Sequence, residues 1–383
     1  MTELFLHDSG RSGKVGWAVE TIASGHAAGV VVSPWETPPV PEPYRPSAHQ
    51  VAQSVVDAGG EVLFDPGTHG VFVQGADHHK YYEQWDLWPS GRPVKNDTAL
   101  ARHVERVVDV QRELGAPIVA PTLSLESPTN ADSVRSIAMA REARRLARNE
   151  DLYVSVIGTP GFWSSGADLD ALVGQIAQLR PTGWLLGTMR GSGSYPWIDA
   201  SAAEVEGLCR TVHSVSDRAR ALAVYSDLAG LPLSVAGAQI IGTGWDLKQR
   251  VLSGDLFRTS PGIRRQSLRV THRELHGSLK QQEAERLNAG DAALSDRLVP
   301  GRLPIGFNAH WQHHLRVLSE LAAMIGDLAT RSERTLFLRN RYEQAKIDFE
   351  AASRHARPLE ADAQQWIDPL LEGLNTYAAS ENL

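Results

Sequence analysis

The feature that most restricts the fold is a series of eight short apolar runs, separated by segments of helical periodicity, within the first part of the chain. Each run is hydrophobic without a break, which predicts strands buried on both faces, as in a parallel sheet. Eight β-then-α units over about 250 residues match a (β/α)8 barrel of the TIM type, and a doubly wound open sheet is the alternative with the same local pattern. The runs cover residues 4–8, 29–33, 61–65, 116–120, 152–157, 183–187, 221–226 and 238–242.

The chain of 383 residues exceeds the usual size of a single core, which predicts one large domain with an appendage. We expect an α/β barrel over residues 1–252, a basic and loop-rich connector over 253–305, and an α-helical extension over 306–383 that can also support a homo-oligomer. Barrel helices are expected at residues 14–24, 98–114, 131–148, 169–179 and 202–218. Extension helices are expected at residues 307–330, 333–355 and 361–379, the last interrupted by Pro369.

Composition restricts which cellular compartment and which kind of partner we expect for this chain. A single cysteine, Cys209, excludes an internal disulfide framework and a cysteine-based zinc site. The N-terminus has no basic segment ahead of an apolar core, and no stretch approaches the roughly 18 apolar residues of a membrane-spanning helix. The net charge of −7 disfavours a whole-molecule nucleic-acid binder. These features predict a cytoplasmic protein without a membrane partner.

Polar side chains close most of the predicted strands. Because the carboxyl ends of barrel strands meet at one face, we expect these side chains to converge on one pocket. Carboxylates, a histidine and an arginine on one rim would supply a general acid, a general base and charge stabilisation, although an aspartate at such a position can equally cap a helix. The candidate catalytic residues are Asp8, Glu36, Asp65, His69, Arg190 and Asp227.

The loop after the third run is unusually long, with about thirty residues before the next helix. Long βα loops overhang the active face of a barrel, and this one is rich in histidine and aromatic residues. Trp85 and Trp88 are therefore predicted to stack on a flat or sugar-like part of a substrate. The proline-rich loop that follows the second run is expected to form part of the same wall.

The first loop resembles a phosphate loop only superficially. Asp8 stands where such a loop needs its first glycine, and Val15 replaces the hydroxyl residue that binds magnesium, so we exclude a nucleoside triphosphatase. Lys14, at a helix start, could still contact an anionic substrate.

The eighth run ends in the glycine-rich sequence Gly242-Thr243-Gly244. This segment resembles the end of strand eight in phosphate-binding barrels, where glycines let backbone amides approach a phosphate. Trp245 and Asp246 depart from that pattern, and glycines here also permit close packing of a strand on a helix. The resemblance implies a phosphate-bearing substrate, and flavin mononucleotide (FMN) would also fit it.

Histidines raise the question of a metal. His310, His313 and His314 lie on one face of a predicted helix, and His78 and His79 with Asp65 and His69 offer a second group. Neither spacing is a zincin motif, and the histidine pair of metal-dependent barrel hydrolases is missing from the first strand. No metal ligands are therefore assigned. The sequence requires no cofactor, and FMN or a divalent metal remain as options.

Two classes of function fit these features. The first is an enzyme of glycosyl-transfer or hydrolase type acting on a phosphate-bearing small molecule, a nucleotide or a nucleic acid. Within it, Asp8-Ser9-Gly10 resembles the start of the DSGGFQ element of transglycosylases that exchange bases in tRNA, although their zinc-binding cysteines are absent. The second is a non-catalytic nucleic-acid or protein interaction module that uses the basic C-terminal segment. Its candidate contacts are Arg258, Arg264, Arg265 and Arg269.

Overall fold

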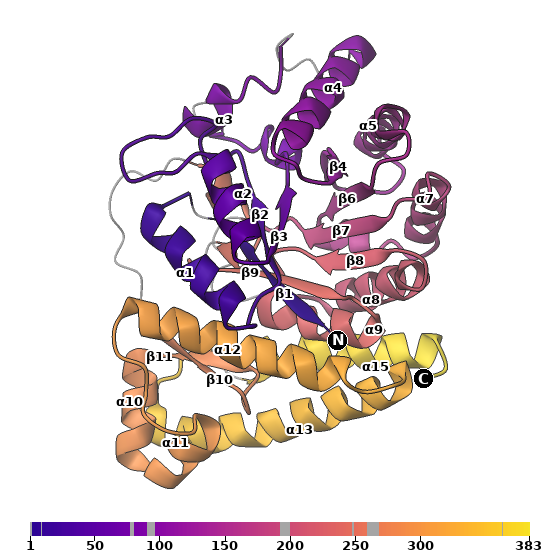
Figure 1. Cartoon of the computed structure of the whole chain (residues 1–383). Helices are drawn as coiled ribbons and strands as arrows, with labels where there is room; N and C mark the ends of the chain where they lie inside the picture. The colour runs from indigo at the N-terminus through magenta and orange to yellow at the C-terminus, as the bar shows by residue number, and fades with distance from the viewer. Residues whose placement is uncertain are drawn as a thin grey trace.

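The computed structural model describes residues 2–8, 10–76, 80–89, 96–191, 200–246, 249–258, 268–361 and 363–383. Its centre is a parallel sheet whose strands follow the order β3-β2-β1-β9-β8-β7-β6-β4, with helices outside it (Figure 1). This is the predicted (β/α)8 barrel, and every predicted run forms one of its strands. The strands are β1 Glu3–His7, β2 Gly29–Val32, β3 Glu61–Phe64, β4 Ile118–Ala120, β6 Leu152–Gly158, β7 Gly183–Thr188, β8 Arg220–Ala223 and β9 Ile240–Gly244. A short strand, β5 Ser124–Leu125, extends the pairing of β6.

The side chain of Gln111 bridges β3 and β4, the first and last strands in this order. β3 and β4 contact each other, and the buried side chain of Gln111 lies between them. Gln111 Nε2 donates to the carbonyl oxygens of Phe64 and Val119 at 3.1 and 3.0 Å, and Gln111 Oε1 accepts the Val119 N–H at 3.2 Å. The amide thus satisfies backbone groups that a ladder would otherwise pair, which leaves the barrel nearly closed.

Side-chain caps start many of the helices that surround the barrel. Ser47 and Gln50 form a capping box on α2, and Asn96, Asn130 and Ser201 cap α4, α5 and α8. The five predicted barrel helices are present, and their ends differ by no more than two residues from the prediction. The helices that follow strands are α1 Ser12–Ala23, α2 Ala48–Asp57, α3 Lys80–Gln84, α4 Asp97–Glu113, α5 Ala131–Ala147, α6 Pro160–Trp163, α7 Ala167–Ala177, α8 Ala202–Ser216 and α9 Leu231–Ala236.

The segment that follows β9 differs from the predicted loops. It contains the antiparallel hairpin of β10 Arg269–His272 and β11 Gly277–Lys280, followed by α10 Gln281–Gly290 and α11 Ala292–Leu298. The next helix, α12 Phe307–Gly326, packs against β1 and α9 (Figure 1). It therefore occupies the place of the eighth barrel helix, and the helix layer is completed inside the segment predicted as an extension.

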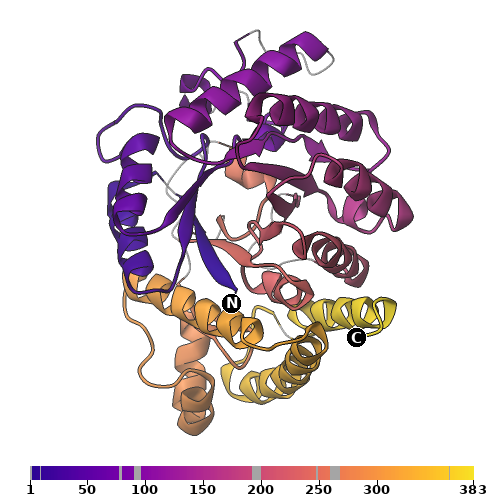
Figure 2. The ribbon, with the colours of Figure 1, turned by 45° about the vertical axis from the view of Figure 1, so that its right-hand side comes forward.

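The remaining helices form an outer layer along one flank of the barrel (Figure 2). They are α13 Arg331–Ala356, α14 Ala363–Trp366 and α15 Asp368–Ser380. Pro369 lies in the first turn of α15, where a proline is tolerated, and this explains the predicted interruption. α15 packs on α8, and α13 packs on α9.

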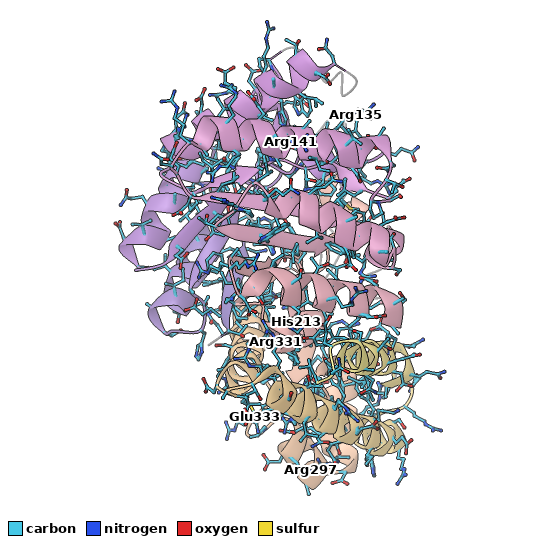
Figure 3. All side chains as sticks on the ribbon, turned by 90° about the vertical axis from the view of Figure 1, so that its right-hand side faces the viewer. Arg135, Arg141, His213, Arg297, Arg331 and Glu333 are labelled. Atoms are coloured by element: carbon cyan, nitrogen blue, oxygen red, sulfur yellow. The ribbon has the colours of Figure 1, made fainter. Side chains whose placement is uncertain are left out.

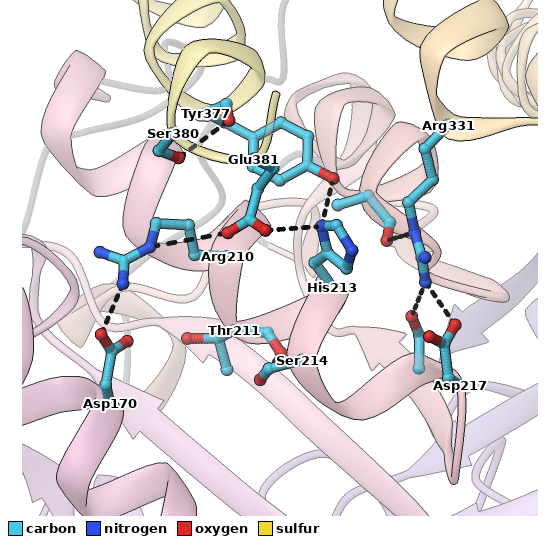
Figure 4. Close-up of polar contacts among 12 residues, drawn as sticks. Asp170, Arg210, Thr211, His213, Ser214, Asp217, Arg331, Tyr377, Ser380 and Glu381 are labelled. Atoms are coloured by element: carbon cyan, nitrogen blue, oxygen red, sulfur yellow. Dashed lines mark hydrogen bonds and ion pairs between the residues drawn. The ribbon is translucent and has the colours of Figure 1, made fainter. Parts of the chain in front are cut away.

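Polar contacts fix this outer layer to the barrel. Figure 3 shows His213 of α8 beside Arg331 of α13. Figure 4 shows Glu381 between His213 and Arg210, at 3.5 and 3.9 Å, while the Tyr377 hydroxyl lies 3.0 Å from His213 Nδ1. Arg331 donates to Asp217 at 2.6 Å. A groove of about 510 Å³ lies here, next to the residues that precede β8 and β9, and so at the end of the barrel opposite the predicted active face.

Candidate active site

Asp8 ties the first two βα loops together. Asp8 Oδ1 accepts the Gly10 N–H at 3.0 Å, and the Thr37 hydroxyl donates to Asp8 Oδ2. Gly10 has a φ of 60°, and a Cβ on it would lie 2.1 Å from the carbonyl oxygen of Glu36. The glycine of the phosphate-loop-like segment is therefore used for close packing of two backbone segments. Asp8 is buried and orders these loops.

Lys14 and Asp246 form a buried ion pair between α1 and the residues that follow β9. Lys14 Nζ also lies 5.0 Å from the ring centroid of Trp311 on α12. Burial lowers the pKa of Lys14, and the charge of Asp246 acts in the opposite direction. The positive charge of Lys14, which was predicted to contact an anionic substrate, is thus neutralised within the protein.

Asp65 follows β3 and lies at the mouth of the barrel. It is 2% exposed, and its Oδ1 accepts the Gly67 N–H at 2.9 Å. Within the described residues it forms no ion pair. Burial lowers the pKa of His69, and Asp65 acts on that histidine in the opposite direction, so His69 is neutral at neutral pH. The His69 ring packs edge-on against Phe257, with centroids 5.6 Å apart.

Tyr225 is a functional candidate that the sequence analysis missed. It follows β8, and its ring stacks on His7 with centroids 3.5 Å apart. Burial, and then the negative charges of Asp65 and Glu36, raise the pKa of its hydroxyl well above the ordinary value, so the group stays protonated. The signal was a tyrosine directly before the polar strand end Ser226-Asp227, inside a run interpreted as core.

Backbone strain also marks this strand end. Tyr225 and Asp227 have φ angles of 51° and 49°, a region that side-chain-bearing residues rarely adopt. The Tyr225 N–H donates to His7 Nε2 at 2.9 Å and fixes the imidazole. Strained residues of this kind gather at functional sites, where the surrounding structure holds them in place.

Atoms of the protein occupy the space beside Gly242 and Gly244, the glycines of the eighth barrel strand. A Cβ on Gly242 would lie 2.7 Å from His7 Nε2, and a Cβ on Gly244 would lie 2.3 Å from the Gln249 side chain. The Thr243 hydroxyl, between them, donates to Asp227 Oδ2 at 2.8 Å. Gly242 and Gly244 thus allow close contact with His7 of β1 and with Gln249.

Asp227 is enclosed by donors from three segments. Besides the Thr243 hydroxyl, His314 Nε2 lies 3.1 Å from its Oδ2, and Arg250 Nε lies 3.6 Å from the same oxygen. Burial would raise the pKa of Asp227, but His314, Arg250 and Thr243 hold it below its ordinary range. His314 Nδ1 lies 2.8 Å from the Thr271 hydroxyl of β10. Asp227 thus connects the barrel mouth with α12 and the hairpin.

The next three candidates, Arg190, Trp85 and Trp88, are all buried. Arg190 forms a buried ion pair with Glu204 of α8. Trp85 and Trp88 are buried rather than open to a substrate. Trp85 Nε1 donates to the Thr37 carbonyl at 2.9 Å, and Trp88 stacks on His103 with centroids 3.8 Å apart.

The described arginines of the predicted nucleic-acid contact have partners within the protein. Arg269 is buried and pairs with Glu360, while exposed Arg258 donates to the Gln74 carbonyl at 2.8 Å. Arg264 and Arg265 lie outside the described residues, as do His78, His79 and Ser9.

The three histidines of α12 bind the hairpin. His310 Nδ1 lies 2.8 Å from the Arg269 carbonyl oxygen, and His313 Nε2 lies 2.7 Å from the Thr271 carbonyl oxygen. Together with the His314–Thr271 contact, this explains their spacing. In the described part of the chain, no group of three or more histidine, cysteine, aspartate or glutamate residues is arranged to hold a metal ion.

Buried neutral histidines predict loss of stability in acid. Burial lowers the pKa of His7, His272 and His276 to about 3 and that of His103 to about 4. The unfolded chain binds these protons near pH 6.5, so the unfolding free energy falls as the pH drops below that value. One pH unit below it, each of these histidines lowers the unfolding free energy by about 1.4 kcal/mol.

We expect the unfolding free energy, measured by urea titration, to be several kcal/mol lower at pH 5.5 than at pH 7.5. His272→Phe removes a ring whose two nitrogens have no hydrogen-bond partner in the described part of the chain, and it should reduce this difference by one histidine's share. Equal unfolding free energies at the two pH values would contradict the assignment.

Comparisons with known proteins found solved structures of low similarity to this chain. No family model matches the chain, and no curated protein matches it. One similar structure is a xylose isomerase-like TIM barrel/4-hydroxyphenylpyruvate dioxygenase fusion protein, at 16% identity and a TM-score of 0.38 over 68% of this chain. The chain spans 40% of the length of that protein.

Two further structures match over more of the chain. A probable tagatose 6 phosphate kinase from Sinorhizobium meliloti 1021 has 12% identity and a TM-score of 0.38, over 99% of this chain and 100% of its own. An L-ribulose 3-epimerase has 12% identity and a TM-score of 0.36, over 85% of this chain and 96% of its own. No helix among the described residues has the length and apolarity needed to cross a membrane.

Proposed function

We propose that this chain is a barrel enzyme that uses carboxylate acid–base chemistry at the mouth of the barrel. Asp65 acts as the base, the protonated Tyr225 hydroxyl acts as the donor, and Glu36 completes the negative rim. The chemistry is of the glycosyl-transfer or hydrolytic kind, in which one group removes a proton while another supplies one.

The observation that carries the proposal is the environment of Asp65. Asp65 is 2% exposed and has no ion pair among the described residues. Burying such a carboxylate destabilises the fold, so a purely structural role does not explain its position. It acts on the Tyr225 hydroxyl, which is held by strained backbone and by the His7 stack. Such a pair of groups is the arrangement expected of a proton-transfer site.

The charges at the mouth favour a neutral, hydroxyl-bearing substrate over the phosphate-bearing substrate or nucleic acid expected from the sequence. The buried cations Lys14, Arg190 and Arg250 each pair with a carboxylate. Asp65 and Glu36 add negative charge, which would repel a phosphate. A small polyhydroxylated molecule has donors for both carboxylates.

The test compares Tyr225→Phe with the matched control Tyr44→Phe, whose side chain is exposed. The purified proteins are incubated with neutral sugars, polyols and nucleosides and with their phosphorylated counterparts, and conversion is followed by mass spectrometry. We expect the parent protein to convert a neutral compound and Tyr225→Phe to do so about a hundredfold more slowly. Full activity in a folded Tyr225→Phe protein, or conversion of phosphorylated compounds alone, would contradict the proposal.

A further inference from the structure

A small cavity lies behind the barrel mouth, between the ends of β7 and β8 and the helix α8. Its volume is about 40 Å³, and α15 contributes Leu370 to its wall. Since one water needs roughly 10–15 Å³ by this kind of measure, the cavity has room for about three or four non-hydrogen atoms. Its polar lining consists of Thr188, Arg190, Glu204, Tyr225 and Ser226.

Glu204 presents an unused acceptor in this lining. The residue is 1% exposed, and its Oε1 accepts from Arg190 Nη2. Its Oε2 is buried and has no hydrogen-bond partner among the residues that the structure describes. A buried acceptor without a donor is destabilising, so the fold retains a group that a ligand donor would satisfy.

The surroundings define the kind of donor. Arg190 balances the charge of Glu204, so the cavity offers no net charge to attract an ammonium group. Ser226 Oγ donates to the Ala223 carbonyl at 2.6 Å and therefore keeps lone pairs that can accept another hydrogen bond. The remaining wall is apolar and includes Leu186, Val205, Leu208, Val224 and Val251.

We propose that this cavity is a binding site for a neutral hydroxyl-bearing molecule of short-alcohol size, whose O–H donates to Glu204 Oε2. The carbon end of the ligand packs on the apolar wall between the sheet and α8. Binding at this site does not depend on the proton-transfer chemistry proposed for the mouth. Tyr225 borders the cavity, so the ligand lies next to the mouth.

The experiment measures binding of 2-fluoroethanol to the full chain by fluorine NMR, with 2-fluoroethylammonium as the charged probe of equal size. We expect saturable binding of the alcohol and at least tenfold weaker binding of the ammonium ion. Glu204→Gln replaces the acceptor with an amide donor and should weaken alcohol binding at least tenfold. Glu206→Gln, on the same helix but outside the cavity lining, should leave it unchanged.

A second variant decides the matter if Glu204→Gln fails to fold. Ala229→Leu adds carbon atoms to the cavity wall and should abolish binding in a folded protein. The proposal is overturned if 2-fluoroethanol does not bind saturably or if both probes bind equally. It is also overturned if a folded Glu204→Gln or Ala229→Leu protein binds the alcohol like the parent chain.

Discussion

Asp227→Asn should lower the unfolding free energy on the order of 3 kcal/mol, because it removes the charge from a buried cluster that keeps its cation. The asparagine retains the shape and can still accept the Leu228 N–H that now lies 2.7 Å from Oδ1. Its amide N–H would face the Thr243 hydroxyl and His314 in place of an acceptor. Arg250, 3.6 Å away, would lose its counter-charge in the interior.

Chemical unfolding followed by circular dichroism measures this effect, with Asp109→Asn as the control on the exposed face of α4. The control should stay within about 0.5 kcal/mol of the parent protein. Since Asp227 connects β8 with α12, limited proteolysis should also cleave the C-terminal helices of the variant sooner. An Asp227→Asn protein as stable as the control would show that the cluster does not anchor α12.

Asp65→Asn should have the opposite profile, with little or no loss of stability and a fall in turnover of about 10²- to 10⁴-fold. Asp65 has no ion pair to lose within the described residues, and an asparagine oxygen can still accept the Gly67 N–H. What disappears is the group that takes the proton. Turnover of the compound identified in the conversion screen is the measurement.

The two aspartate variants form a matched pair, since each replaces one buried carboxylate by its amide at the same barrel mouth. Turnover per folded molecule should fall strongly in Asp65→Asn, whereas Asp227→Asn should lose mainly stability. If Asp65→Asn keeps full turnover, Asp65 is not the base. If it unfolds as readily as Asp227→Asn, the carboxylate has a structural role instead.

α12 packs on the barrel itself, against β1 and α9. Because this helix completes the barrel's helix layer, residues far beyond the eighth strand contact the strand ends. Thr21 Oγ1 of α1 lies 3.3 Å from Gln312 Oε1, and Trp17 packs on Trp311 with centroids 4.9 Å apart. Truncation after β9 would therefore expose one flank of the barrel rather than release an independent appendage.

Local sequence pattern was enough to predict the barrel strands and most of the helices around them. The strand β2 can be predicted from its own unbroken apolar run. The interruption of the last helix near Pro369 can likewise be predicted from the local sequence. The hairpin and helices between residues 269 and 298 were not predicted; they pack on one another and also on α12 and α13, which follow later in the chain.

By itself, the sequence determined the order of strands and helices and the face on which polar strand ends would gather. It could not separate the carboxylates, because a strand-end aspartate looks the same whether it is paired or not. Asp246 meets Lys14 across 232 positions and Asp227 meets His314 across 87, so only the tertiary structure supplies those partners. Tertiary contacts likewise decided that Gly242 packs on His7 and that Tyr225, unmarked in the sequence, shares the mouth with Asp65.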